Sequence, residues 1–367
     1  YSTGPTRALC EVLLPDCGRI NEEDAFYANK AGFSKHKPAL PIYTEADARQ
    51  ALKAFRTVAP RRPFEIGEMT FELTEVGHIL GACSVTVRQG KKSVCFSGDV
   101  GRDNDLVELA PKNNNGADVV VMETTYGDRS HGEEDPIQVI ADLVQNTAHR
   151  GGMTLIPSFA VGRTQALLYC LWQGFERGYL KRLPVYVDSP MATRVTELYT
   201  SFVGWHRLDR DQAQDMCAIA DFVGSVDASK GLNQKQDPFV LISASGMLTG
   251  GRVLHHLKRR GPQPNNLILL PGFQAAGTRG AKLAGGAKSI KVHGEEVTIA
   301  AEVVQLDVFS AHADQNGLES WLKGLQKQPH TVYLVHGEPR ARDAFADRLE
   351  GQYPKVVCPE FGEVVPV

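Results

Sequence analysis

Alternating apolar and polar positions predict a strand-rich first third of the chain. Residues Met69 to Val76 alternate in this way, which is the period of a half-buried strand. Val85 to Val87 and Ser93 to Phe96 flank Gln89-Gly90-Lys91 and predict a hairpin. Ala117 to Met122 is a mostly apolar run, which is typical of a strand buried on both faces.

The pattern changes in the middle of the chain, where strand and helix signals alternate from about Pro136 to Lys282. Strand and helix pairs are predicted at Met153–Pro157 with Gly162–Phe175, Pro184–Val187 with Ala192–Phe202, Pro238–Ser243 with Gly250–Arg260, and Leu267–Leu270 with Arg279–Ala284. This alternation predicts a parallel, doubly wound sheet. The middle is therefore expected to be a second domain inserted into the first.

The two ends of the chain carry weaker signals. Ala8 to Leu14 has helical periodicity, and the chain opens at Tyr1 without a methionine, so we expect an entry in the middle of a domain. Lys291 to Leu306 predicts a hairpin around His293-Gly294-Glu295, followed by strand–loop–helix units that end at Val367.

Composition narrows the class of protein. With 367 residues, 42% of them hydrophobic, the chain can form two domains or three. Its net charge of −3 means that any site for a polyanion must rely on local positive charge or on metal ions. Seven cysteines occur without Cys-x-x-Cys spacing, which favours reduced thiols in a cytoplasmic protein over a cysteine zinc site. No apolar run has the length of a membrane span, and no signal peptide is visible.

Three metal-capable side chains follow predicted strands. His78, Asp99 and His336 each lie at or just beyond a strand end. Imidazole and carboxylate both bind Zn²⁺, and one carboxylate can span two metal ions. Taken singly, a histidine after a glycine is usually structural, and Asp99 suits a turn. Their order along the chain favours a dinuclear metal site.

A known family shares these motifs. Those that carry the resemblance are Gly77-His78, Phe96-Ser97-Gly98-Asp99, Glu123-Thr124-Thr125-Tyr126-Gly127, Phe309-Ser310-Ala311-His312 and Val335-His336-Gly337-Glu338. They resemble the later motifs of β-CASP ribonucleases of the metallo-β-lactamase superfamily. Pro157 to Arg163, Asp188 to Ala192 and Ser243 to Leu248 look like that family's inserted domain. The resemblance covers essentially the whole chain and is greatest for prokaryotic RNA-processing members similar to the polyadenylation endonuclease.

This resemblance implies an α/β fold. It combines a metallo-β-lactamase αββα sandwich, incomplete at the N-terminus, with an inserted doubly wound parallel-sheet β-CASP domain. The expected divisions are residues 1–128 and 303–367 for the metallo-β-lactamase domain and 129–302 for the β-CASP domain.

The resemblance also implies zinc-dependent hydrolysis of RNA by a metal-bridging hydroxide, leaving 5′-phosphate and 3′-hydroxyl ends. Two Zn²⁺ ions are implied, with Mn²⁺ as an alternative: His78 and Asp99 would hold one, Asp99 and His336 the other. Glu123 would orient His312 as the general acid. The family's other ligands lie in a His-x-His-x-Asp-His string, which these 367 residues lack. The chain alone is therefore expected to bind metal weakly and to be inactive.

Substrate contacts are expected from loops before helices in the inserted domain. Arg163 follows a glycine at a helix start, where backbone N–H groups favour an anion. The full set of predicted substrate-binding residues is Ser158, Arg163, Ser245, Gly246, Arg252 and His131. The expected partner is single-stranded RNA, with a homodimer possible and no membrane association.

Other classes remain open at this point. A non-catalytic RNA-binding β-CASP scaffold is disfavoured because His78, Asp99, Glu123, His312 and His336 are all present. A metallo-β-lactamase-fold hydrolase of small esters or thioesters is disfavoured by the long insert between Glu123 and His312. DNA is a less expected substrate because the last histidine motif resembles the RNA-cleaving members.

Overall fold

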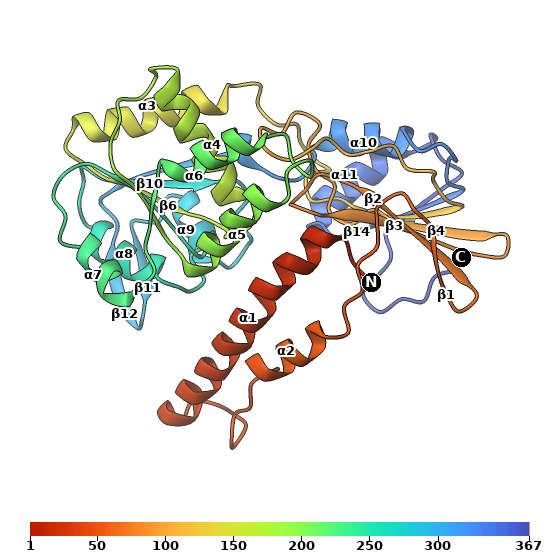
Figure 1. Cartoon of the computed structure of the whole chain (residues 1–367), viewed down its shortest axis with the longest axis horizontal. Helices are drawn as coiled ribbons and strands as arrows, with labels where there is room; N and C mark the ends of the chain where they lie inside the picture. Colours follow the sequence, from red (N-terminus) through yellow and green to blue (C-terminus); the bar gives the residue numbers. More distant parts are fainter. Residues whose placement is uncertain (367) are drawn as a thin grey trace.

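Two sheets organise the chain into two lobes, and a long helix projects from the junction between them (Figure 1). The structure is a computed structural model that describes residues 1–366. The first lobe holds a seven-stranded sheet and the second lobe a six-stranded sheet, with a separate two-stranded hairpin.

The seven-stranded sheet joins the early part of the chain to its end. Its strands are β1 (Phe64–Ile66), β2 (Met69–Glu75), β3 (Cys83–Gln89), β4 (Lys92–Phe96), β5 (Val119–Glu123), β14 (Thr331–Val335) and β15 (Lys355–Val357), in the order β1-β2-β3-β4-β5-β14-β15. Strands β1 to β4 are antiparallel, whereas β4, β5, β14 and β15 run parallel. The pairing of β5 with β14 brings the motifs from both ends of the sequence to one edge of the sheet.

Helices cover one face of this sheet. Met122 and Val332 on that face pack against Leu322 of α10 (Gln315–Lys323) and Phe345 of α11 (Pro339–Leu349). Side chains alternate between the two faces along each strand, so the residues between those facing the helices lie on the opposite face. That face is also apolar. Its partly exposed side chains include Phe71, Val85, Val87, Val94, Phe96 and Val121. Such a face has the character of a sheet surface that packs against a second layer.

The six-stranded sheet is entirely parallel. Its strands are β6 (Thr154–Pro157), β7 (Val185–Asp188), β8 (Asp221–Phe222), β9 (Val240–Ser243), β10 (Leu267–Pro271) and β13 (Glu302–Leu306), in the order β13-β10-β6-β9-β7-β8. Ile156 faces a core shared with α3 (Pro136–His149), α4 (Arg163–Glu176), α5 (Pro190–Ser201) and α6 (Arg210–Ala218). Its neighbour Leu155 faces a second core with α7 (Val226–Leu232), α8 (Val253–Arg260) and α9 (Arg279–Ala284). Helices on both faces make this a doubly wound sheet, and the mixed α/β architecture confirms the predicted fold class.

The predicted hairpin after residue 290 is shorter than expected. Strands β11 (Ser289–Val292) and β12 (Glu295–Thr298) form it. The following strand, β13, pairs in parallel with β10 instead. The inserted sheet therefore continues to Leu306. The domain boundary expected between residues 302 and 303 falls directly after the first residue of β13, so it would cut this strand.

The helix predicted at Ala8 to Leu14 is the start of α1 (Gly4–Ala31). Thr3 caps its N-terminus and Gly32, with φ 68°, caps its C-terminus. Helix α2 (Glu45–Leu52) returns alongside α1, and the two form an arm that extends from the junction of the lobes (Figure 1). Within residues 1–366, no helix is both long and apolar enough to span a membrane.

Candidate metal centre at the junction of the lobes

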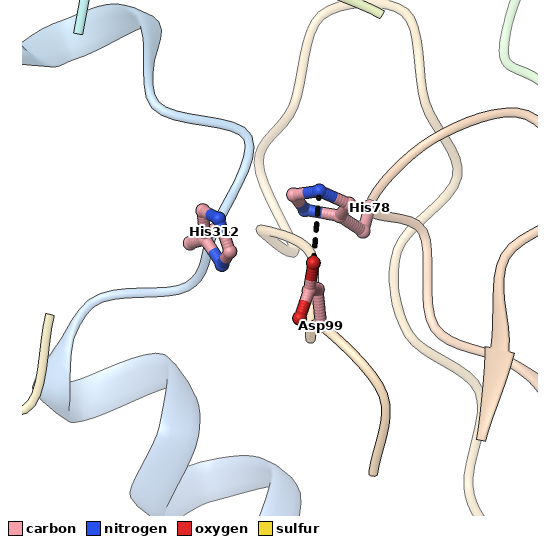
Figure 2. A group of neighbouring side chains, drawn as sticks. All are labelled: His78, Asp99 and His312. Atoms are coloured by element: carbon pink, nitrogen blue, oxygen red, sulfur yellow. Dashed lines mark ion pairs between the residues drawn. The ribbon is translucent and has the colours of Figure 1, made fainter. Parts of the chain in front are cut away.

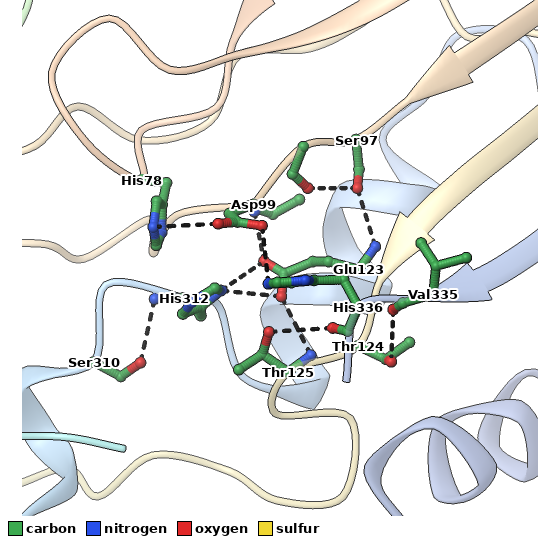
Figure 3. Close-up of polar contacts among 12 residues, drawn as sticks. His78, Ser97, Asp99, Glu123, Thr124, Thr125, Ser310, His312, Val335 and His336 are labelled. Atoms are coloured by element: carbon green, nitrogen blue, oxygen red, sulfur yellow. Dashed lines mark hydrogen bonds and ion pairs between the residues drawn. The ribbon is translucent and has the colours of Figure 1, made fainter. Parts of the chain in front are cut away.

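Four strand ends of the first lobe bring the predicted site residues together (Figure 3). His78 follows β2, Asp99 follows β4, Glu123 ends β5 and His336 follows β14. His312 comes from the segment that connects β13 of the second sheet to α10.

Asp99 lies between two imidazoles. Its Oδ2 is 3.6 Å from His78 Nε2, the contact drawn in Figure 2, and its Oδ1 is 3.4 Å from His336 Nε2. One carboxylate oxygen thus faces each histidine, which is the arrangement that a bridging carboxylate requires. Ligand atoms of His78, Asp99 and His312 also lie within 4.8 Å of one another. His312 is therefore near enough to serve as a metal ligand as well as a proton donor.

Glycine fixes the backbone that presents these side chains. At Gly77, with φ 65°, an added Cβ would lie 1.8 Å from the carbonyl oxygen of Leu109. Gly98 also has a positive φ, 59°, just before Asp99. His336 itself has φ 48°, a conformation that costs energy for a residue other than glycine and that is often found at functional sites.

Glu123 and His312 form a buried acid–imidazole pair. His312 Nδ1 is 3.0 Å from both carboxylate oxygens of Glu123. The backbone N–H groups of Val100 and Thr125 also donate to this carboxylate. Burial raises the pKa of Glu123, but the hydrogen bond and charge of His312 outweigh it and leave that pKa below its usual value.

The two neighbouring histidines differ in charge preference. Burial opposes protonation of His312, yet the hydrogen bond and charge of Glu123 raise its pKa above the usual value. Burial, together with the charge of His312, lowers the pKa of His78 to about 4. His78 is therefore neutral at neutral pH, the form in which imidazole binds a metal. Its Nδ1 is buried without a hydrogen-bond partner among residues 1–366. The donor set and the neutral imidazole of His78 fit a metal centre.

A cavity of about 360 Å³ opens beside His78 and His312. Both lobes and the base of the arm contribute to its wall, which also includes Leu13, Ile79, Phe159, Arg163, Met191, Met247 and Phe273. Burial lowers the pKa of Arg163 to about 10, so its guanidinium stays cationic at neutral pH. Its Nη1 is buried and has no hydrogen-bond partner within the described chain. Gly272, with φ 95°, leaves room for this group, because a Cβ there would lie 2.3 Å from Nη1.

The other predicted substrate-binding side chains are engaged within the protein. Ser158 is buried and accepts a hydrogen bond from Thr164 Oγ1. Ser245 Oγ accepts from the backbone N–H groups of Thr249 and Gly250. The remaining glycine, Gly246, lies so close to Phe159 that an added Cβ would be 2.9 Å from its ring.

Arg252 and His131 have structural partners. Arg252 Nη1 donates to the buried carboxylate of Asp188 at 2.7 Å, and Asp188 also accepts from His256 and Ser229. Burial would raise the pKa of Asp188, but these hydrogen bonds lower it. His131 Nε2 lies 3.0 Å from the carbonyl oxygen of His312 and so supports the loop that carries His312.

Sequence reasoning missed most of the cavity wall. Phe159 lies inside the Pro157–Arg163 motif, and Met247 inside the Ser243–Leu248 motif, so both were adjacent to predicted residues. Leu13 and Phe273 lie in segments whose periodicity signals only packing or a loop. No local pattern assigns them to a site, because the cavity forms where distant segments of both lobes and of the arm meet.

Imidazole and carboxylate groups that meet at strand ends are the donor types of metal-dependent hydrolases, and here they lie on a two-lobed α/β fold. Residues 164–283 match the Beta-Casp domain, and residues 296–359 match the Zn-dependent metallo-hydrolase RNA specificity domain. The chain is 34% identical to "Ribonuclease TTHA0252" of Thermus thermophilus, over all of this chain and 81% of the relative. It is 30% identical to an "RNase J-like protein" of Methanocaldococcus jannaschii, over 91% of this chain and 81% of the relative.

Two further matches extend the comparison. "Transcription termination factor FttA" of Methanocaldococcus jannaschii is 28% identical over 97% of this chain, which spans 57% of that relative. A solved structure, a protein of unknown function from Enterococcus faecalis V583, has a TM-score of 0.50 and 13% identity over 99% of this chain and 74% of its own. The chain therefore belongs to the β-CASP family of metallo-β-lactamase-fold ribonucleases, as its motifs predicted.

Proposed function

We propose that the protein is a zinc-dependent ribonuclease that hydrolyses single-stranded RNA and leaves 5′-phosphate and 3′-hydroxyl ends. The observation that carries this proposal is the Glu123–His312 pair beside the imidazoles of His78 and His336 and the carboxylate of Asp99. An imidazole that a carboxylate orients beside metal-binding groups can donate the proton that the leaving group of phosphodiester hydrolysis takes up.

The metal ligands follow from the contacts around Asp99. His78 and Asp99 would hold one ion and Asp99 and His336 a second, because each imidazole faces a different oxygen of the carboxylate. Zn²⁺ suits this donor set, and Mn²⁺ also accepts imidazole and carboxylate ligands. When bound, such ions supply Lewis acidity and lower the pKa of a bound water.

His312 would donate the proton that the departing 3′ oxygen needs. Its Nδ1 faces Glu123, so Nε2 is the ring nitrogen left to face substrate. Burial opposes protonation of His312, but Glu123 raises its pKa above the usual value and so favours the imidazolium, the form that donates a proton. Glu123 is thus a positioning residue, since it acts through His312 rather than on the RNA.

Arg163 would hold a phosphate of the RNA. Its unpartnered Nη1 and the neighbouring rings of Phe159 and Phe273 belong to one cavity wall beside His312. A buried guanidinium without a carboxylate gains most from a charged oxygen ligand. The aromatic side chains offer apolar contact to a base.

We further propose that residues 1–128 and 307–367 form the metal-binding domain and residues 129–306 the RNA-clamping domain, because β13 pairs with β10 of the inserted sheet. The predicted metal ligands are only His78, Asp99 and His336, because the sequence lacks a His-x-His-x-Asp-His string. Metal binding and hydrolysis by these residues alone are therefore expected to be weak. A cytoplasmic location and a homodimer stay predictions.

The test is metal-dependent hydrolysis of a labelled, unstructured RNA, with the matching DNA as control. The chain is assayed with Zn²⁺, with Mn²⁺ and with a chelator, both alone and with a His-x-His-x-Asp-His segment joined ahead of Tyr1. We expect chelator-sensitive cleavage of RNA that increases when the segment is present, and mass spectrometry should show 5′-phosphate ends. Cleavage that resists the chelator would contradict the proposal, and RNA binding without any cleavage would favour the scaffold.

A further inference from the structure

The tip of the arm exposes aromatic rings. Phe26 and Tyr27 near the end of α1 are 62% and 61% exposed, and Phe33 in the following loop is 73% exposed. Leu40 and Ile42 in the same loop are also exposed. Single exposed apolar residues are common on protein surfaces, but a group of large ones at one tip indicates a binding surface.

The same tip carries three lysines. Residues 25–44 contain three lysines, Lys30, Lys35 and Lys37, and no aspartate or glutamate. All three lysines are exposed, and within residues 1–366 none of them forms an ion pair. The arm tip is defined here as residues 26–42.

The stem of the arm differs from its tip. Three arginines on α1 and α2 each form an ion pair with a carboxylate three or four residues away in the same helix. They are Arg7, Arg19 and Arg49. Three acidic residues directly precede the tip, at positions 22–24. Of these, Glu23 pairs with Arg19, and Glu22 accepts a hydrogen bond from the backbone of α2. Glu22 and Asp24 form no ion pair within residues 1–366, so the lysines of the tip lie just beyond two unpaired carboxylates at the end of the stem.

Internal hydrogen bonds hold the tip against the helix. Asn29 Nδ2 donates to the carbonyl oxygen of Ala39 at 2.9 Å, and the N–H of Ala39 donates back to Asn29 Oδ1 at 2.7 Å. Pro38 and Pro41 restrict the backbone of the loop. A surface held in this way loses less conformational entropy on binding than a free loop would.

The arm starts at the candidate metal centre. Leu13 of α1 forms part of the cavity wall beside His78 and His312. Phe26 lies 13 residues further along the helix, roughly 20 Å from Leu13 at 1.5 Å per residue. Figure 1 shows α1 running from the junction of the lobes to this distant tip. A strand that leaves the cavity along α1 would therefore reach the tip.

We propose that the arm tip is a second binding site for single-stranded RNA, in which Phe26, Tyr27 and Phe33 stack on bases while Lys30, Lys35 and Lys37 contact phosphates. Aromatic platforms combined with positive charge bind single strands with little sequence preference. Lysine is depleted at protein–protein interfaces, so the lysines favour RNA over a protein partner. The choice of RNA rests on the proposed ribonuclease function.

The test measures binding separately from cleavage. Fluorescence anisotropy of a labelled oligouridine is recorded with the full chain in the presence of a chelator, over a series of salt concentrations. One variant is Phe26→Ala with Phe33→Ala, and a second is Lys35→Gln with Lys37→Gln. The matched control changes an exposed aromatic and an exposed lysine of the second lobe, Tyr179→Ala with Lys181→Gln.

Removing the aromatic rings should weaken binding by about tenfold per ring. Removing the two lysines should reduce the slope of log K against log salt by about 1.4, since each phosphate contact on a single strand contributes ~0.7. A merely structural effect would not change this slope by that amount. The control should bind as the unchanged chain does.

Arm variants that bind oligouridine like the unchanged chain at every salt concentration would overturn the inference, even if the protein cleaves RNA. Loss of binding in these variants supports it, even if no cleavage is found and the ribonuclease proposal fails. Phosphatidylserine vesicles provide the remaining comparison. Vesicle binding that needs the arm tip, with oligouridine binding unaffected, would replace RNA by an anionic membrane and overturn the inference.

Discussion

A buried glutamic acid joins the two lobes and should make stability depend on pH. Glu108 belongs to the first lobe and is 4% exposed, and its Oε1 accepts a hydrogen bond of 2.5 Å from Tyr199 of α5. Arg207 lies nearby but donates to the backbone carbonyl of Glu108, so no cation among the described residues pairs with the carboxylate. Burial is the main cause that raises the pKa of Glu108 to about 8 from its usual 4.5, and the charge of Asp105 adds to it.

The sign of the effect follows from the raised pKa. Between pH 4.5 and 8 the unfolded chain loses the proton from Glu108 while the folded chain keeps it. The folded state therefore binds more protons, and the free energy of unfolding falls as pH rises. The contribution is fully present below about pH 4.5 and is lost as pH rises toward about 8. At 1.36 kcal/mol for each pH unit, the loss between pH 4.5 and 7 is about 3 kcal/mol.

The assay is urea unfolding of the unchanged chain and of Glu108→Gln at several pH values. Glutamine keeps an acceptor for Tyr199 but does not titrate. The difference between the two free energies of unfolding removes the contributions of all other groups. We expect Glu108→Gln to gain about 3 kcal/mol relative to the unchanged chain from pH 4.5 to 7. The exposed Glu134→Gln serves as control, and parallel pH profiles for Glu108→Gln and the unchanged chain would refute the reasoning.

The remaining predictions concern the site and its scaffold. In the chain joined to the His-x-His-x-Asp-His segment, His312→Ala should lower turnover by roughly 10²- to 10⁴-fold with near-normal metal content, whereas Asp99→Ala should lower both. Full turnover in either variant would refute the roles, and metal loss in His312→Ala would make His312 a ligand. Arg163→Gln should reduce kcat/KM by about 10- to 150-fold, chiefly through KM, and unchanged steady-state kinetics would exclude a phosphate contact. Gly77→Ala should lower the urea midpoint far more than Gly90→Ala, because both have positive φ but only Gly77 has a backbone carbonyl where the Cβ would lie. Equal midpoints would show that the loop before His78 relaxes freely.

Local patterns predicted much of the fold because each strand and helix buries one repeating face. The expected strand at Leu267–Leu270 and the expected helix at Arg279–Ala284 match β10 and α9 within one residue. The destination of β13 was not predictable, since a short apolar run pairs equally well with a hairpin partner or with a distant strand. Only the full packing of the second sheet places it beside β10.

The same limit applies to the site. The proximity of His78, Asp99 and His336 was predictable because each of them follows a strand, and strand ends meet at one edge of a sheet. The partner of Arg252 was not predictable, because a glycine-rich loop before a helix has the same sequence pattern whether its arginine faces RNA or a buried carboxylate. Asp188, which accepts from Arg252, lies 64 residues away in the sequence.

The candidate metal-binding side chains lie on the first lobe, whereas part of the cavity wall lies on the second lobe. His78, Asp99, Glu123 and His336 all belong to loops or strands of the first sheet, and Ala313 N–H donates to Val100 O, which fixes the segment carrying His312 to the same lobe. The second lobe contributes the opposite wall of the cavity, including Arg163. A change at the joint between the lobes should therefore alter the fit of RNA more than the binding of metal. Weakening the Glu108–Tyr199 contact should raise KM while metal content stays constant, because His78, Asp99 and His336 all lie at strand ends of the first lobe.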